Sequence, residues 1–391
     1  MTNAPIHHAM RPPSSRLMTR EFLILGSMSA VFFACTGGAN ALMPRFVVDE
    51  LGGSETTAGI VMGSLAISSL LTRPWYGRLA DRRGAKLLLI IGTVIAAAGY
   101  AVLLVPSTVG LAIVSRLIVG AGQAGLFVGM SMLAMQIAPD DRRSEAASYM
   151  LVSVHVGLGM GPIAGEAVRN SLSYDTAWLL VVGMILISTA IALTLPDRPG
   201  SPDAEPAPLI QKNAIGPGLA SFFGVFAFSG FLTFLPLYGR EVGLEEVGLV
   251  FTVASLTIVV MRVLFGRVPD LVGPIRAANV ALIVTVVATF VVALWAAPAG
   301  LYVGAALLAI GLSLQSPSFM ALAIDGVDER ERGSAMATYT GFFDLAGALV
   351  GPTIGLMVSG VSYQAAFLVT GAMSLAAIAV LQLMVAPRHQ R

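Results

Sequence analysis

The sequence contains few charged residues and almost no cysteine. Charged residues make up 12% of the 391 residues, about half their share in an average soluble protein. The single cysteine, Cys35, excludes an internal disulfide, and no Cys/His cluster has metal-ligand spacing. A glycine-rich phosphate loop and a nucleophile–base constellation are also missing. We therefore expect no catalytic residues, no metal, no cofactor and no nucleic-acid partner.

Long apolar segments fill most of the chain. Hydrophobic residues account for 56% of it, and the mean hydropathy is +0.83. About twelve segments of roughly 20 residues could each cross about 30 Å of hydrocarbon as a helix, and they lack the alternation of barrel strands. The expected helices lie near residues 22–44, 56–76, 85–105, 108–137, 144–168, 174–195, 214–238, 247–267, 276–297, 299–323, 332–358 and 363–386.

The distribution of positive charge predicts the topology. Arg45, Arg169 and Arg240 fall on one side and Arg116 falls within a span, so 23 − 4 = 19 of the 23 Lys and Arg lie on the other side. The positive-inside rule then predicts a multi-pass protein of the cell (inner) membrane with both termini in the cytoplasm. The first 20 residues lack the apolar core of a cleavable signal peptide.

Two features of the sequence occur twice. The loop GRLADRRGAK at 77–86 returns as GRVPDLVG at 266–273, which is 266 − 77 = 189 residues later. A glycine–proline stripe in the fifth helix returns in the eleventh. We therefore expect an all-α membrane protein whose twelve transmembrane helices form two pseudo-symmetric six-helix bundles. The expected parts are an N-terminal tail (1–20), a bundle (21–195), a cytoplasmic linker (196–213), a second bundle (214–386) and a C-terminal tail (387–391).

These motifs resemble the major facilitator superfamily over nearly the whole chain. The pattern G-x-x-x-D-R-x-G-x-K at 77–86 is similar to the family's signature loop, and R-x-x-x-G-x-G from Arg116 is similar to its second motif. The stripe of the fifth helix is similar to a motif of proton-coupled drug exporters, with Ser148 and Glu166 in place of two glycines. The resemblance implies an alternating-access carrier similar to the small bacterial efflux proteins.

Four side chains are candidates for proton coupling: Glu166, Asp344, Arg116 and His155. Each acid lies well inside a span, where a charge costs at least about 2.5 kcal/mol. Asp344 is expected to carry a proton or else to make a fixed hydrogen bond. Glu166 is expected to form an ion pair with Arg116 that opens on protonation; a static pair, or an Arg116 bonded only to carbonyl groups, is the alternative. His155 lies on nearly the same helix face as Glu166 and is expected either to titrate or to make a fixed hydrogen bond.

The duplicated loop is the expected gating latch. Asp81 is expected to accept hydrogen bonds from a helix N-terminus of the other half, and Arg73 is expected to pair with Asp81. For Arg82 and Lys86, topology and lipid headgroups are the alternative explanation. The complete latch set is Arg73, Gly77, Asp81, Arg82, Gly84, Lys86, Arg262 and Asp270.

The resemblance also implies a central cavity lined by the first, fourth, seventh and tenth helices. An apolar lining with few polar groups suits lipophilic or amphipathic substrates. About half of the phenylalanines in the seventh helix are expected to face lipid instead. The expected cavity residues are Phe33, Asn40, Gln123, Phe222, Phe226 and Gln315.

Glycines and prolines in the fifth and eleventh helices are expected to act as helix hinges, although such glycines can simply pack helices together. These residues are Gly161, Pro162, Gly165, Gly351 and Pro352.

The sequence as a whole predicts a secondary active transporter that exports a small lipophilic or amphipathic compound, a drug or a metabolite, by proton antiport. Proton-coupled or facilitative movement of a sugar, organic acid or metallophore is the alternative. A second alternative is a non-transporting sensor or enzyme on the same scaffold. The expected partners are a small-molecule substrate, protons and membrane lipids, and the expected state is a monomer.

Overall fold

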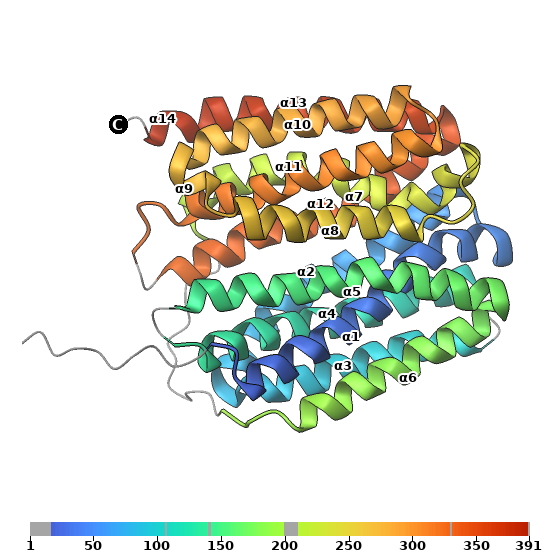
Figure 1. Cartoon of the computed structure of the whole chain (residues 1–391), viewed down its shortest axis with the longest axis horizontal. Coiled ribbons are helices and arrows are strands. Elements are labelled where there is room, and N and C mark those ends of the chain that lie inside the picture. Colours follow the sequence, from blue (N-terminus) through green and yellow to red (C-terminus); the bar gives the residue numbers. More distant parts are fainter. Residues whose placement is uncertain (1–16, 106–107, 140–141, 199–209, 329–330, 390–391) are drawn as a thin grey trace, which may run out of the picture.

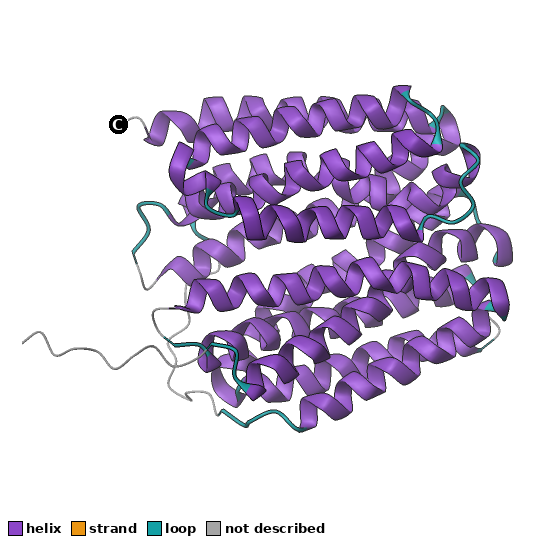
Figure 2. Cartoon of the chain, viewed as in Figure 1, coloured by secondary structure: helices purple, strands orange, loops and turns teal. Residues whose placement is uncertain are grey.

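A computed structural model describes residues 17–105, 108–139, 142–198, 210–328 and 331–389. The side chains at 81, 144, 270, 332, 388 and 389 are not described. Parts of the expected tails and linker therefore lie outside the described residues, at 1–16, 199–209 and 390–391. The described residues form helices and loops without a strand (Figure 2), which confirms the predicted all-α fold class.

The helices fall into two consecutive groups. The first group consists of α1 (Arg20–Arg45), α2 (Glu55–Arg83), α3 (Ala85–Ala101), α4 (Val109–Ile137), α5 (Arg143–Ser171) and α6 (Tyr174–Leu193). The second group consists of α7 (Ile215–Glu241), α8 (Gly248–Phe265), α9 (Val268–Val272), α10 (Pro274–Leu294), α11 (Pro298–Ile324), α12 (Arg332–Gly360), α13 (Tyr363–Val380) and α14 (Ala386–His389).

Hydroxyl side chains fix where several helices begin. A free amide in the first turn donates to a Ser or Thr oxygen at the N-cap, which satisfies a group that the helix itself leaves unpaired. These caps are Thr19, Ser54, Thr108, Ser173 and Ser362, before α1, α2, α4, α6 and α13.

Eleven helices of the described part are long and apolar enough to cross a membrane. α2 is the one long helix outside this set, although it is 29 residues long. It packs against α4 within its own group and against α12 of the other group. A helix enclosed by other helices carries more polar residues than a lipid-facing one, which explains its lower hydropathy.

Figure 1 shows the two groups as stacked bundles whose helices run side by side. The pairs α2–α12, α5–α8 and α1–α7 connect the bundles. We call the end near α14 and residue 198 the linker end, and the opposite end, where α1 and α7 finish, the far end. The exact predicted bundle boundaries stay a prediction.

Glycines bring helices into backbone contact at two of the expected hinges. A Cβ at Gly161 would overlap the carbonyl oxygen of Ala34 in α1, and a Cβ at Gly351 would overlap that of Gly59 in α2. The first contact lies within a bundle and the second lies between bundles. Both glycines therefore serve close packing, as small residues do in membrane helices, and their hinge role stays a prediction.

The duplicated loop folds differently in its two copies. α2 continues through the first copy to Arg83, well past the expected end at residue 76. In the second copy α8 ends at Phe265, and Pro269 lies in the first turn of the short helix α9. Proline has no amide hydrogen for a helix interior, so Pro269 at the position equivalent to Ala80 explains the break.

Candidate coupling and gating site

The carboxylate of Glu166 reaches from α5 to the beginning of α8 in the other bundle. Its Oε1 accepts a hydrogen bond from the backbone N–H of Val247 at 2.9 Å, and its Oε2 accepts one from that of Gly248 at 2.8 Å. Glu166 is only 5% exposed. Unpaired amides and the helix dipole make a helix N-terminus favourable for an anion. The carboxylate thus joins the two bundles near the far end.

Arg116 does not pair with Glu166, so the expected ion pair is wrong. Its Nη2 donates to Asn40 Oδ1 of α1 at 2.8 Å, and the side chain is 2% exposed. Among the described residues, its Nε and Nη1 have no hydrogen-bond partner. Neighbouring depth misled the prediction, because Arg116 faces α1 and α2 within its bundle whereas Glu166 lies on the side of α5 that faces α8.

A second carboxylate joins the bundles at the middle of α12. Nη2 of Arg73 in α2 lies 3.1 Å from each oxygen of Asp344 and donates a hydrogen bond to Oδ1. The guanidinium carbon also lies 5.7 Å from the ring centroid of Phe127. Arg73 therefore pairs with Asp344 instead of the expected Asp81. Arg73 precedes Asp81 by more than two helical turns, so both side chains cannot share one level of the membrane.

Arginines at the far end make further contacts between the bundles. Arg45, 2% exposed, donates from Nε to the carbonyl oxygen of Pro236 in α7 at 2.8 Å. Arg240 donates to both carboxylate oxygens of Asp49, at 2.9 and 2.6 Å. We did not predict these contacts. A signal was present, because Arg45 and Arg240 are exceptions to the positive-inside pattern and such charges need partners.

Polar side chains complete the far-end gate, which we define by the contacts of Glu166, Arg45, Asp49–Arg240, Asn170 and Thr56. Asn170 donates to Glu246 Oε1 at 2.7 Å. Thr56 donates to the carbonyl oxygen of Gly355 at 3.0 Å and lies 2.9 Å from the hydroxyl of Ser359. Among the described residues, the side-chain hydrogen bonds between bundles run only from the level of Arg73 to this end.

The latch roles stay predictions. The side chains of Asp81 and Asp270 lie outside those described, Arg82 is exposed, and Lys86 is half-buried. Gly84 has φ +86° at the junction of α2 and α3, a conformation that suits glycine. A Cβ at Gly77 would meet open space.

His155 lies on the α8 side of α5. Its Nδ1 is 2.8 Å from the carbonyl oxygen of Leu151, one turn earlier. That contact matches the expected alternative of a satisfied histidine, and titration stays a prediction. Arg262 of α8 is close enough to interact with it electrostatically.

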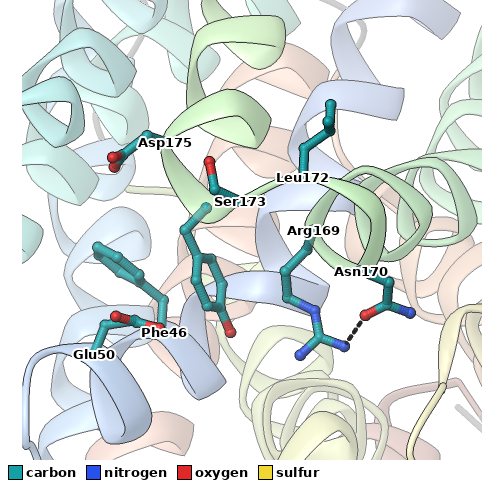
Figure 3. Close-up of a pocket in the computed structure, with 8 residues that line it drawn as sticks. Phe46, Glu50, Arg169, Asn170, Leu172, Ser173 and Asp175 are labelled. Atoms are coloured by element: carbon teal, nitrogen blue, oxygen red, sulfur yellow. Dashed lines mark hydrogen bonds between the residues drawn. The ribbon is translucent and has the colours of Figure 1, made fainter.

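A surface pocket of about 450 Å³ lies at the far end of the first bundle (Figure 3). Arg169 lines it beside Asn170, to which it donates a hydrogen bond, and the acids Glu50 and Asp175 lie on the other walls. The pocket lies outside the predicted central cavity, and the sequence gave no indication of it.

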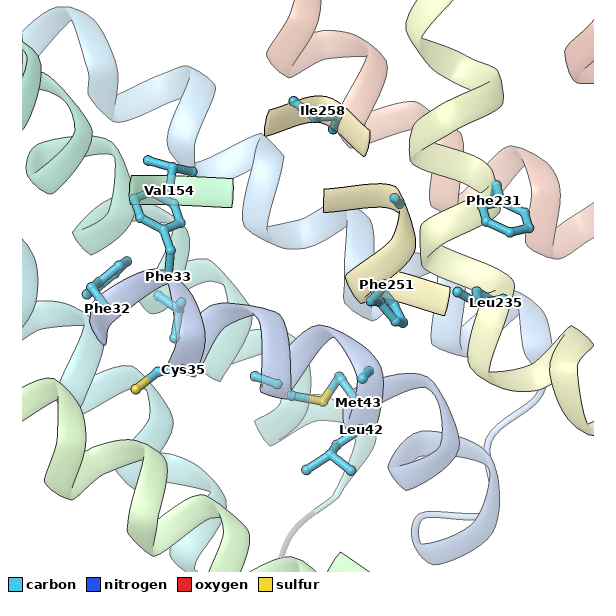
Figure 4. Packing of buried hydrophobic residues seen from close by; sticks show 14 of the residues in the cluster. Phe32, Phe33, Cys35, Leu42, Met43, Val154, Phe231, Leu235, Phe251 and Ile258 are labelled. Carbon is cyan, nitrogen blue, oxygen red and sulfur yellow. The ribbon is translucent and has the colours of Figure 1, made fainter. Parts of the chain in front are cut away.

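The predicted cavity residues are packed inside the bundles. Phe33 is 3% exposed and lies beside Val154 in Figure 4, and Phe226 is 2% exposed. Phe222 is half-buried and packs edge-to-face on Phe226. The described phenylalanines of α7 are all buried or half-buried, so the expectation that half of them face lipid is wrong. α7 contacts α1, α12 and α13 and is enclosed by helices.

Two polar atoms of the predicted cavity lack protein partners in the described structure. They are Gln123 Oε1 and Gln315 Nε2, both buried. The Gln315 side chain packs against Gly224, where a Cβ would lie 2.6 Å from Nε2. Buried amide groups normally have hydrogen-bond partners, so both atoms are suited to contact a bound molecule.

Two connected helical bundles with buried charges at their contacts define a polytopic membrane carrier. The sequence matches the Major Facilitator Superfamily over residues 25–298 and 218–391, and the chain belongs to that family. It is therefore a multi-pass secondary transporter of small molecules and not an enzyme.

Known relatives are similar over most of their length. An uncharacterized MFS-type transporter of Salmonella typhimurium is 27% identical over 88% of this chain and 91% of its own. The uncharacterized MFS-type transporter YhhS of Escherichia coli is 27% identical over 87% of this chain and 86% of its own.

Solved transporters share the fold. A peptide transporter POT superposes with a TM-score of 0.81 at 15% identity, over 96% of each chain. The nucleoside transporter NupG superposes with a TM-score of 0.79 at 14% identity, over 93% of this chain and 100% of its own.

Proposed function

We propose that the protein exports a small lipophilic or amphipathic organic compound by proton antiport with alternating access. The observation that carries the proposal is the placement of the two membrane-embedded carboxylates. Asp344 binds Arg73 and Glu166 binds the first amides of α8, so each acid ends on the opposite bundle. A proton on either acid weakens a contact that must break when the bundles rearrange.

The excess of positive charge places the linker end in the cytoplasm and both termini with it. The far-end gate then faces outside, and the structure corresponds to a carrier closed to the exterior of the cell (inner) membrane.

Asp344 is the proposed proton carrier. After it releases its proton to the cytoplasm, its charge pairs with Arg73 and holds the empty carrier closed to the outside. A hydrogen bond to a charged group contributes about 1.5–3 kcal/mol, so the pair resists opening until substrate binds. An external proton later neutralises Asp344 and permits the return. This order links outward substrate movement to inward proton movement.

Glu166 is the proposed lock of the far-end gate. In its charged form it accepts two amide hydrogen bonds at a position that the helix dipole favours. Protonation removes that attraction and weakens the gate. Arg116 and His155 then serve to position groups in the first bundle, Arg116 through Asn40.

The cavity residues support an apolar substrate with few polar groups. Phe222 and Phe226 offer aromatic surface on α7, and the unpartnered atoms of Gln123 and Gln315 offer one acceptor and one donor. We further propose that the carrier acts as a monomer in contact with membrane lipids.

Reconstituted vesicles test the coupling roles. Asp344→Asn and Glu166→Gln keep the side-chain shapes but cannot exchange a proton. Each variant should lose accumulation driven by a pH gradient and retain exchange of labelled substrate across the membrane. If both variants concentrate substrate at the wild-type level, neither acid couples protons to transport.

A further inference from the structure

The two long contacts between the bundles are pseudo-equivalent. One is α2 against α12, and the other is α8 against α5. Arg143 begins α5 and Arg332 begins α12, a difference of 332 − 143 = 189 residues. The duplicated loop that follows α2 and α8 has the same offset. Residues 189 apart should therefore occupy matching places in the two contacts.

Atomic contacts agree with this offset. In one contact the hydroxyl of Thr252 donates to the carbonyl oxygen of Gly159 at 2.6 Å. In the other, a Cβ on Gly63 would lie 2.6 Å from the carbonyl oxygen of Ala348. Both residues of the second contact are related to the first by the offset, since 252 − 63 and 348 − 159 each give 189.

The same offset relates Arg73 to Arg262 and Asp344 to His155. The first contact therefore contains an arginine with a carboxylate, and the second contains an arginine with an imidazole. Among the described residues no carboxylate lies within ion-pair distance of Arg262, and its Nε is buried without a hydrogen-bond partner. Its electrostatic neighbours are His155 and the hydroxyl of Tyr339.

Arg262 does not project into lipid. On α8 it continues the face of Gly248, Thr252 and Ser255, which contacts α5, whereas Val263 and Leu264 are each 68% exposed. A guanidinium among helices without a counter-charge is costly in a membrane. An anionic ligand would supply the missing charge.

The charges in the middle of the protein point the same way. Arg73, Arg116 and Arg262 lie within helices of the carrier, and Asp344 is the acid that faces one of them. The excess is 3 − 1 = 2 positive charges. Glu166 does not reduce this excess, because it is bound to the amides of α8.

We propose that Arg262 binds the carboxylate of an anionic amphipathic substrate, at the place where the pseudo-equivalent contact has its own acid. The guanidinium donates to the carboxylate oxygens, and the apolar remainder of the ligand packs on neighbouring aromatic side chains. This inference depends on the proposed function only in taking the bound molecule to be the transported one.

Binding to the detergent-solubilised full chain provides the test. Calorimetry compares 1-naphthoate, benzoate and decanoate with the matching amides 1-naphthamide, benzamide and decanamide. At least one carboxylate should bind about tenfold more tightly than its amide, because a charge-assisted hydrogen bond replaces a neutral one. If no carboxylate binds better than its amide, the proposal is wrong.

Variants then assign the preference to this site. Arg262→Gln should remove it by deleting the charge. His155→Asp should also remove it, because it gives Arg262 an internal acid at the place equivalent to Asp344. His155→Asn, which keeps the residue neutral, should preserve it. If Arg262→Gln does not fold, His155→Asp decides alone; a carboxylate preference that survives in every folded variant places the anion elsewhere.

Binding and transport separate the two proposals. A carboxylate preference without substrate-driven proton movement supports the anion site and contradicts proton antiport. Proton-coupled transport of neutral compounds, with no preference for carboxylates in binding, supports antiport and contradicts the anion site.

Discussion

Asp344→Asn should shift the carrier away from the state closed at the far end. The substitution keeps the shape of the side chain but removes the charge that pairs with Arg73 at 3.1 Å. The two side chains are 23% and 11% exposed, so solvent screens the pair only in part. A hydrogen bond to a charged group contributes about 1.5–3 kcal/mol. Its loss therefore lowers the ratio of far-end-closed to far-end-open molecules by about 10–150-fold.

Distances between spin labels at the linker end measure this ratio. Cys35 is the single cysteine and is buried, so Cys35→Ser provides a background without reactive thiols. Labels at Arg82 and Leu271 lie on exposed positions of opposite bundles. In the variant, the population with the longer linker-end distance should shrink and a shorter distance should appear.

The control is Glu145→Gln, which removes an ion pair of 2.7 Å with Arg142 near the linker end of one bundle. This pair does not join the bundles, so the variant should keep the wild-type distances. An Asp344→Asn distribution that matches the wild type at neutral pH would refute the reasoning that the pair with Arg73 holds this state.

Other contacts give three further predictions. Glu166→Gln should speed hydrogen–deuterium exchange in the first turn of α8 by about tenfold, because the variant loses the charge that those amides bind; unchanged exchange would show that the carboxylate does not hold them. Gly351→Ala should destabilise the detergent-solubilised protein by about 1–3 kcal/mol in thermal unfolding, because the added methyl group overlaps the backbone of α2, and Gly341→Ala, which meets one atom at 3.9 Å, should have little effect; equal stabilities would contradict the close contact. A double-mutant cycle of Asp49→Asn with Arg240→Gln should give a coupling of at most about 1 kcal/mol, because these side chains are 32% and 39% exposed, and a value above about 2 kcal/mol would show that this pair carries the gate.

The sequence was sufficient for the architecture because membrane helices announce themselves. Apolar length sets each span, and a buried acid such as Glu166 or Asp344 stands out because its cost demands a partner. The duplicated loop also identified Arg73 and Arg262 as related positions. These signals depend on composition and spacing along the chain, which the sequence contains directly.

The partners of these charges could not be predicted in the same way. Helical depth placed Glu166 near Arg116, but the direction in which each side chain points around its helix decides the contact. Glu166 faces the other bundle, and its partners are backbone amides, which no side-chain motif reveals. Arg73 meets Asp344, 271 residues away along the chain. Such contacts depend on how the bundles dock.

Proton movement that accompanies substrate movement tests the central claim most directly. Wild-type protein is reconstituted in vesicles with a pH-sensitive dye inside, and substrate candidates, including the carboxylates above, are supplied on the linker side under an imposed pH gradient. We predict that at least one candidate drives protons in the direction opposite to its own movement, and that Asp344→Asn abolishes this flux. Substrate movement with no proton flux, or with protons moving in the same direction, would contradict proton antiport.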